Sequence, residues 1–173
     1  MDSKSIFLIS ALVLLFAFSG CVNSKYESRD TSTIPPATSI TSFQVIPNAA
    51  VCTQDGKPII RLYSTTFCPH CRWVNSTFNG VMDEYVKQGK IVAYHYDLDL
   101  GNDQFTPEKE TAVPAAEVEL FKQTNPEQSV PTYLFGCKYY RVGNAFEVQD
   151  DLDLEAAEFK AVIDKLLDDV KGS

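Results

Sequence analysis

The sequence predicts one α/β domain with a central, mixed four-stranded sheet flanked by helices. Short apolar runs alternate with longer segments whose apolar residues recur at helical spacing, in the order strand, helix, strand, helix, strand, strand, helix. The two strand–helix–strand steps favour parallel pairing, and the last two strands favour an antiparallel hairpin. The 173 residues are 45% apolar and 22% charged, which suits one domain with an ordinary core.

The expected elements follow closely on one another. A turn signal at residues 55–58 precedes an apolar run that reads as a buried strand. Gly89 is a plausible stop for the first helix, and Asp153 can cap the last helix, which has a continuous apolar stripe. We expect strands at residues 59–63, 91–96, 132–135 and 138–142, and helices at residues 69–89, 115–124 and 154–170.

The first 20 residues are typical of a signal peptide. Ile6 to Phe18 is almost wholly apolar, too short for a comfortable membrane span, and small residues follow it. Cys21 comes directly after Ser19-Gly20, which resembles the lipobox of bacterial and archaeal lipoproteins, although Phe18 departs from it. That resemblance implies cleavage before Cys21 and lipidation of its thiol; an uncleaved anchor and simple secretion remain open alternatives.

Residues 21–48 are expected to be a flexible tether, and residues 49–173 the folded domain. The stretch from 22 to 42 is rich in Ser and Thr, carries Pro35-Pro36 and has few large apolar side chains. The net charge is −8, so a basic stripe for phosphates is absent and nucleic acid is a poor candidate partner.

The five cysteines are the most informative residues. Cys68-Pro69-His70-Cys71 lies between a predicted buried strand and a predicted helix. A thiolate at Cys68 would face the unpaired N–H groups and the positive end of the helix dipole, and Pro69 suits the first helical position. Cys71 lies on the same side of the first turn, and a protonated His70 would add a second positive charge, which favours the reduced pair.

These residues resemble the active site of the thioredoxin superfamily. The inner Pro-His matches the thiol oxidases of the DsbA type, and residues 62–66 look more like a glutaredoxin. Val130-Pro131 resembles the family's cis-proline loop, which implies that Pro131 is cis and that Val130 contacts a substrate peptide. One departure is Leu62, which stands where thioredoxin and DsbA carry a buried acid, so proton transfer at Cys71 needs another group or water.

The resemblance also places Cys52 and Cys137 close together. In that fold their strands are antiparallel neighbours, so the start of one lies near the end of the other. We expect a structural Cys52–Cys137 disulfide; the alternative is a second redox pair that exchanges electrons with Cys68 and Cys71.

No metal site is predicted. A closed zinc site needs four ligands, and the chain has one Cys-x-x-Cys and two histidines, His70 and His95, that do not complete it. Asp97, Asp99 and Asp103 lack the further ligands of a calcium loop.

The sequence therefore suggests a membrane-anchored, extracytoplasmic thiol–disulfide oxidoreductase in the cell envelope. Cys68 and Cys71 would carry the exchange, Pro69 and His70 would tune it, and no cofactor would be needed. Partners would be protein thiols and disulfides and a membrane redox protein. An oxidase is favoured; the alternatives are a tethered reductase and, outside enzymes, a soft-metal carrier.

Overall fold

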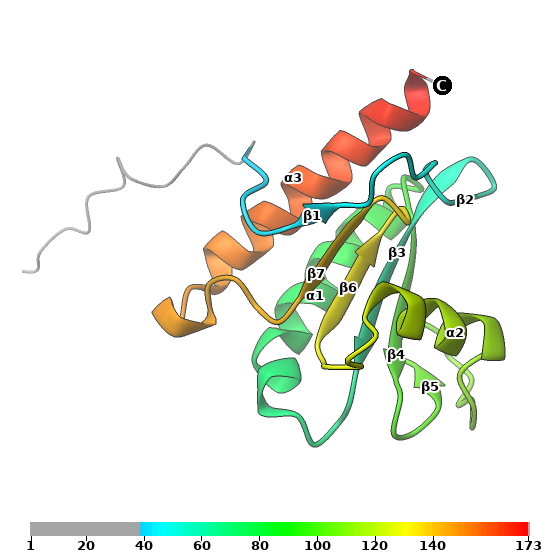
Figure 1. Ribbon diagram of the computed structural model, residues 1–173, viewed down its shortest axis with the longest axis vertical. Coiled ribbons are helices and arrows are strands. Elements are labelled where there is room, and N and C mark those ends of the chain that lie inside the picture. Colours follow the sequence, from blue (N-terminus) through cyan, green and yellow to red (C-terminus); the bar gives the residue numbers. More distant parts are fainter. Residues whose placement is uncertain (1–38, 173) are drawn as a thin grey trace, which may run out of the picture. The chain divides into compact units, whose positions relative to one another are not determined.

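The computed structural model describes residues 39–172, which form an α/β domain with a mixed sheet between helices (Figure 1). The elements, in chain order, are β1 Gln44–Val45, β2 Thr53–Gln54, β3 Lys57–Ser64, α1 Pro69–Lys87, β4 Val92–Asp97, β5 Asn102–Asp103, α2 Ala115–Thr124, β6 Thr132–Phe135, β7 Tyr139–Val142, the 3₁₀ turn η2 Glu147–Gln149, and α3 Leu152–Lys171.

The sheet has seven strands rather than the expected four. Its order is β1-β7-β6-β3-β4-β5, and β2 pairs with β3 beside this path. The expected pairings are confirmed, because β3 is parallel to β4 and β6 forms an antiparallel hairpin with β7. The unexpected strands β1, β2 and β5 have two residues each, too few to show a strand period in the sequence.

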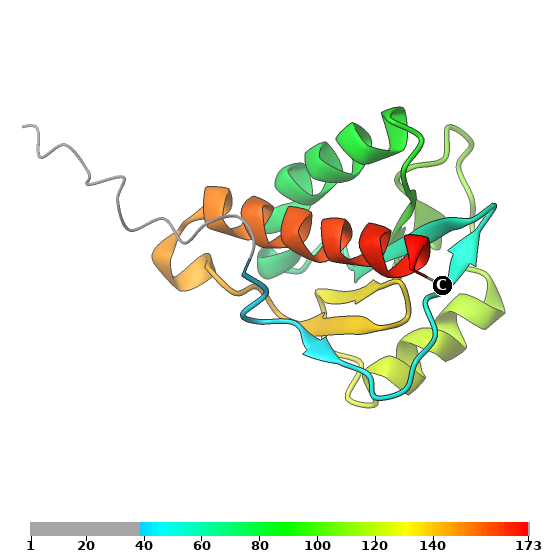
Figure 2. The same cartoon turned by 90° about the horizontal axis from the view of Figure 1, so that it is seen from above.

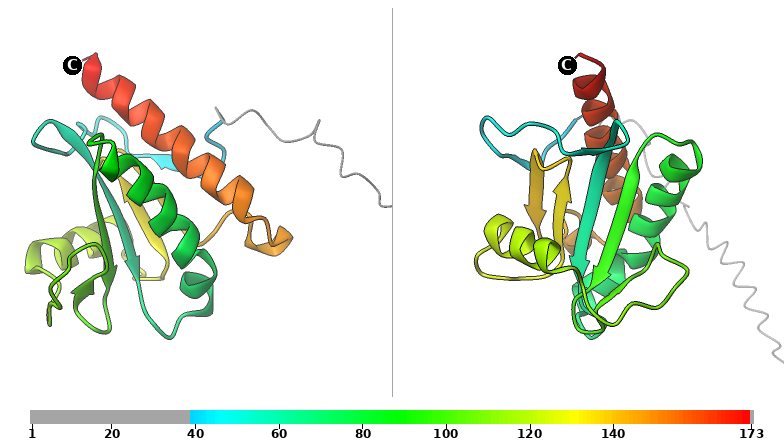
Figure 3. Two further views of the ribbon diagram at one scale, coloured as in Figure 1. Left: turned by 180° about the vertical axis from the view of Figure 1, so that it is seen from behind. Right: turned by 90° about the vertical axis from the view of Figure 1, so that its right-hand side faces the viewer.

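The helices cover both faces of the sheet. Helices α1 and α3 pack side by side on one face, and α2 lies on the other (Figures 2 and 3). Along β3 the side chains alternate, so Ile60 and Leu62 join the core under α1 and α3, while Tyr63 joins a smaller cluster with Phe121 of α2. The larger core is rich in aromatic rings: Phe43, Phe78, Tyr133, Phe135 and Phe159.

A buried ion pair holds α2 against the sheet. Arg61 on β3 is only 6% exposed, and its guanidinium donates hydrogen bonds of 2.7 and 3.0 Å to both carboxylate oxygens of Glu117. The Tyr63 hydroxyl donates a third, of 2.9 Å, to Glu117. Phe121 is the only buried side chain of α2, so the ion pair adds to a small apolar contact.

The folded domain begins earlier than residue 49, which corrects the expected boundary of the tether. The backbone N–H groups of Thr41 and Ser42 donate hydrogen bonds of 2.5 and 2.7 Å to the Glu158 carboxylate on α3. Phe43 is buried in the core, and β1 pairs with β7. Residues 41–45 therefore belong to the domain. The expected signal peptide, and the tether up to residue 38, lie outside the described residues.

Two glutamates of α3 surround a buried arginine from β7. Arg141 is 4% exposed, and its guanidinium pairs with Glu155 and lies 3.1 Å from Glu158. Helix α3 begins two residues earlier than expected, and its N-cap is Asp151, whose carboxylate accepts a 3.0 Å hydrogen bond from the Leu154 N–H. Asp153, the expected cap, lies inside the first turn.

Candidate active site

The Cys-x-x-Cys occupies the first turn of α1, as the sequence predicts. Strand β3 ends at Ser64, and α1 begins at Pro69 after a short loop. Cys68 is the N-cap, with extended backbone, and its Sγ accepts a 3.3 Å hydrogen bond from the Cys71 N–H. The residue type explains the turn, because proline at the first helical position has the required φ and no N–H to leave unpaired.

Cys68 and Cys71 are free thiols with different surroundings. Cys68 is 7% exposed, and its Sγ lies 3.7 Å from the carbonyl oxygen of Val130. Cys71 is 4% exposed, and burial, followed by its hydrogen bond with Cys68, raises the pKa of its thiol to about 12. Cys71 therefore does not ionise readily near neutral pH by itself.

The Val130–Pro131 peptide is cis, as the resemblance implied. It brings the Val130 carbonyl oxygen to Cys68 from the loop before β6, although the two residues are 62 positions apart. A groove of about 490 Å³ lies beside this loop, and its walls are mostly apolar or uncharged. Its lining residues are His70, Val130, Pro131, Gly143, Asn144, Glu147 and Val148.

His70 is held by the segment that precedes α3, which sequence reasoning did not foresee. Its Nδ1 lies 2.8 Å from the Glu147 carboxylate. The Asn144 side-chain amide donates one hydrogen bond to the His70 carbonyl oxygen and another to Glu147, of 2.9 and 2.8 Å. No local pattern in the sequence links Glu147 to His70.

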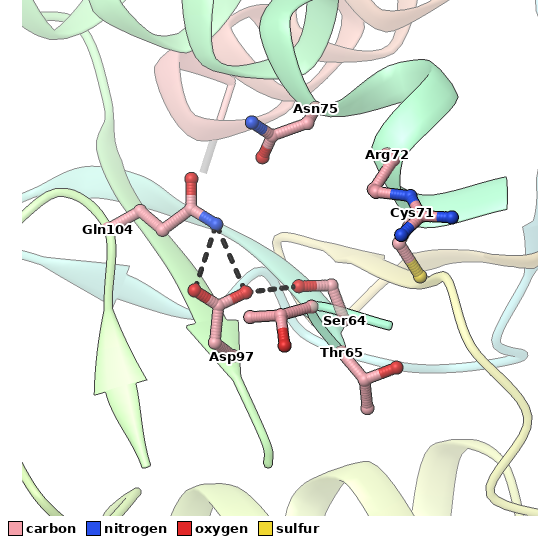
Figure 4. Close-up of a pocket in the computed structure, with 8 residues that line it drawn as sticks. Ser64, Thr65, Cys71, Arg72, Asn75, Asp97 and Gln104 are labelled. Atoms are coloured by element: carbon pink, nitrogen blue, oxygen red, sulfur yellow. Dashed lines mark hydrogen bonds between the residues drawn. The ribbon is translucent and has the colours of Figure 1, made fainter. Parts of the chain in front are cut away.

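A smaller cavity, of about 180 Å³, is lined by Cys71 (Figure 4). It is lined by residues from the end of β3, the first turns of α1, the end of β4 and the loop after β5: Ser64, Thr65, Thr66, Cys71, Arg72, Asn75, Asp97 and Gln104. Asp97 was missed as a site residue. Its position was nevertheless informative, because the carboxyl ends of parallel strands meet at one edge of a sheet.

The predicted Cys52–Cys137 disulfide is present, with a Cα–Cα distance of 5.4 Å. It joins the segment before β3 to the turn after β6, and the Cys52 N–H donates to the Gly136 carbonyl oxygen at 2.8 Å. The Cys52 carbonyl oxygen accepts a 3.1 Å hydrogen bond from the Ile59 N–H, so the disulfide lies beside Ile59. Cys68 follows the other end of β3, and the stretch from Ile59 to Ser64 spans roughly 17 Å. Direct exchange between the two cysteine pairs is therefore excluded in this conformation.

Other expectations concern metal ions and membranes. Within residues 39–172, no three His, Cys, Asp or Glu side chains are placed to share a metal ion. Within the same residues, no helix has the length and apolarity needed to cross a membrane. Cys21, the expected lipidation site, lies outside the described residues.

No protein-family model and no curated protein matches this chain. The geometry of the site is therefore the evidence that bears on function.

Proposed function

We propose that this protein is a thiol–disulfide oxidoreductase with a thioredoxin-like fold. The observation that carries the proposal is the placement of the two free thiols. Both lie in the first turn of α1, and the Cys68 sulfur contacts the cis Val130–Pro131 loop. A thiolate at a helix N-terminus is stabilised by unpaired N–H groups, and a second thiol one turn away can resolve a mixed disulfide.

The arrangement of the longer elements supports the thioredoxin-like fold. Strand β3, helix α1 and strand β4 form a parallel unit, and the β6–β7 hairpin and α3 complete the sheet and cover its face. The short strands β1, β2 and β5 extend this frame at its edges and beside β3.

The proposed reaction passes through a mixed disulfide on Cys68. In the oxidase direction, a substrate thiolate attacks the Cys68 sulfur of the Cys68–Cys71 disulfide, and Cys71 leaves as a thiolate that takes up a proton. A second substrate thiolate then attacks the substrate sulfur of the mixed disulfide, and Cys68 leaves. The substrate loses two electrons and gains a disulfide, while the enzyme pair is reduced. A reductase would run the same steps in reverse.

The two residues between the cysteines have separate proposed roles. Pro69 starts the helix, and His70, between the two cysteines in the sequence, has an exposed imidazole that Glu147 holds. Both would tune the relative stability of thiolate and disulfide. Val130 and Pro131, which line the groove of about 490 Å³, would contact an extended substrate segment.

We propose an extracytoplasmic, membrane-anchored location, with Cys21 as the lipid attachment site. The apolar segment 6–18 and the Ser-Gly-Cys that follows it support this proposal. The Cys52–Cys137 disulfide supports it independently, because structural disulfides persist mainly outside the cytosol. Its partners would be protein thiols and disulfides and a membrane redox protein that resets the Cys68–Cys71 pair.

The test is a redox titration of the full-length protein in graded glutathione buffers. We expect reversible formation of a Cys68–Cys71 disulfide, with a potential of about −120 mV for an oxidase and about −270 mV for a reductase. Cys68→Ser should abolish exchange, whereas Cys71→Ser should accumulate mixed disulfides. Full exchange by Cys68→Ser would overturn the assignment of the nucleophile. Tight stoichiometric binding of Cu(I) by the reduced protein, without exchange, would favour the metal carrier instead.

A further inference from the structure

A polar cavity separates the buried thiol of Cys71 from a buried carboxylate. Asp97 is 6% exposed at the end of β4, and both residues line the cavity of about 180 Å³. In Figure 4 the Cys71 sulfur points from α1 toward the end of β3, where Ser64 and Thr65 lie. The Thr65 hydroxyl is a buried polar atom without a protein partner, so this wall offers a hydrogen bond to water. The volume is large enough for water molecules, which occupy about 30 Å³ each in the liquid.

The carboxylate belongs to a closed circuit of hydrogen bonds. The Ser64 hydroxyl lies 2.9 Å from an Asp97 oxygen and 2.9 Å from His95 Nε2. On the other side of the ring, His95 Nδ1 lies 2.7 Å from the Asn79 side-chain oxygen. The Asn79 amide donates to Gln104 at 2.8 Å, and the Gln104 amide donates to both Asp97 oxygens at 3.0 Å.

All the hydrogen bonds of this circuit can form only when it holds one proton more than a neutral His95 and an ionised Asp97 would carry together. The Asn79 oxygen faces His95 Nδ1, so that nitrogen must carry hydrogen. If His95 is neutral, Nε2 accepts the single Ser64 hydrogen, and Asp97 must donate a hydrogen of its own to Ser64. If His95 is an imidazolium, it donates to Ser64, which donates to an ionised Asp97.

If the side-chain amides of Asn79 and Gln104 are both rotated by 180°, so that oxygen and nitrogen change places, the circuit still needs one extra proton. The Gln104 oxygen would then face Asp97, which would have to be a carboxylic acid. An ionised Asp97 beside a neutral His95 therefore leaves one hydrogen bond unmade, and that state can accept a proton.

We propose that Asp97, Ser64 and His95 form a relay that exchanges a proton with the Cys71 thiol across this cavity. The proposal rests on the proposed redox function of Cys68 and Cys71. The relay would supply the proton acceptor that β3 lacks, because Leu62, which stands where thioredoxin and DsbA carry a buried acid, is apolar and fully buried. The relay would come instead from β4, the strand parallel to β3, together with the last residue of β3 itself.

The charges that surround the two ends of the relay favour this use. Burial lowers the pKa of His95 to about 3, so His95 is neutral at neutral pH, and Asp97 is the end of the relay that lines the cavity. Burial, the Cys68 hydrogen bond and, more weakly, the charge of Asp97 raise the pKa of Cys71, so its thiol needs a proton acceptor at neutral pH. Other titratable or charged groups at the two ends are Tyr133 on β6, Arg72 at the cavity, and Asp103, which lies near Asp97 and also near Glu110.

One proton moves between Cys71 and the relay in each direction of the exchange. When a Cys68 mixed disulfide resolves, the Cys71 S–H proton passes through water to the carboxylate end of the relay. The Cys71 thiolate forms the Cys68–Cys71 bond, the bond from Cys68 to the substrate sulfur breaks, and the substrate leaves as a thiolate. When a substrate thiolate attacks the Cys68–Cys71 disulfide, the relay returns its proton to the departing Cys71 thiolate.

The test is the rate of resolution at Cys71, measured by stopped flow with the reduced full-length protein. A small aromatic disulfide loads Cys68, and release of the second aromatic thiol reports attack by Cys71. At neutral pH, Asp97→Asn should slow this release by about 10²-fold, the lower end of what a general acid–base contributes. Its rate should rise about tenfold per pH unit, because only the ionised thiol then reacts, whereas the wild-type profile should be flatter.

A purely electrostatic or structural role predicts a different result. Removal of a negative charge beside Cys71 lowers the pKa of its thiol, so Asp97→Asn would resolve the mixed disulfide faster if Asp97 acted through charge alone. An equal or faster release at neutral pH would overturn the relay. Ser64→Ala keeps the carboxylate but cuts its link to His95, so it should also slow release and decides the matter if Asp97→Asn does not fold.

Controls separate failure of the relay from failure of the proposed function. Asp83→Asn, on the exposed side of α1, is a matched substitution and should leave both steps unchanged. If no mixed disulfide forms on Cys68 of the wild type, the proposed oxidoreductase function is wrong. If it forms normally and resolves at the same rate in Asp97→Asn, the function stands and the relay is wrong.

Discussion

Removal of the Cys52–Cys137 disulfide should cost much of the stability of the domain. The bridge joins residues 85 positions apart, and the loop-closure relation gives about 4.6 kcal/mol for a loop of that length, while native disulfides typically contribute about 2–4 kcal/mol. A domain of ordinary stability has about 5–15 kcal/mol in total. The paired change Cys52→Ser and Cys137→Ser should therefore bring the protein close to its unfolding threshold.

The assay is urea unfolding of wild type and variant under oxidising conditions. With a slope of about 2 kcal/mol per M, a loss of about 4 kcal/mol lowers the midpoint by about 2 M. Addition of a strong reductant to the wild type is the matched control, because it opens the same loop without a substitution. The two midpoints should then converge.

Two results would contradict this prediction. A loss below about 1 kcal/mol would show that loop closure contributes little here. Loss of Cys68–Cys71 exchange by a folded variant would instead favour the redox-relay interpretation of Cys52 and Cys137. The separation of roughly 17 Å along β3, from Ile59 beside the disulfide to Ser64, predicts that exchange is retained.

Two further predictions concern Glu158, which binds residues 41 and 42, and two of the glycines. Burial by itself would raise the pKa of Glu158, but hydrogen bonds from Ser42 and Thr41 outweigh it and hold the pKa below the ordinary 4.5. Glu158→Gln should therefore lower the free energy of unfolding by about 3 kcal/mol at neutral pH. Urea midpoints of wild type and variant should differ less as pH falls below about 4.5, because the wild-type carboxylate is then protonated. A difference that does not change with pH would contradict an ionic contribution. Gly80→Ala, in open space on α1, should raise the thermal midpoint by the equivalent of about 0.5–1 kcal/mol, because alanine favours the helix. Gly101→Ala should lower the thermal midpoint, because its Cβ would lie 2.6 Å from backbone atoms of Thr111. The opposite order of the two midpoints would contradict this account.

Local patterns were enough to place the main elements. The expected helix at residues 115–124 and the strand at 132–135 agree with α2 and β6, and the last helix differs by two residues at its start and one at its end. Apolar periodicity and turn residues operate over a few neighbouring residues, so they can be read from the chain directly. The three two-residue strands were missed because their partners, not their own sequences, define them.

The cysteines were predicted in two different ways. Cys68 and Cys71 are one helical turn apart, so their proximity follows from local geometry. Cys52 and Cys137 are distant in the chain, and their pairing was expected only because the motifs resembled a family with antiparallel strands at those positions.

The α/β class, the longer elements and the helix that presents Cys68 therefore follow from local patterns in the sequence. The polar side chains that surround the thiols are brought together only by folding. Glu147 reaches His70 from the segment before α3, and Asp97 comes to the cavity beside Cys71 because β4 lies parallel to β3. Neither residue carries a local signature. Burial and hydrogen-bond partners are properties of segments that meet only after folding, and they are what give an ordinary carboxylate its particular role.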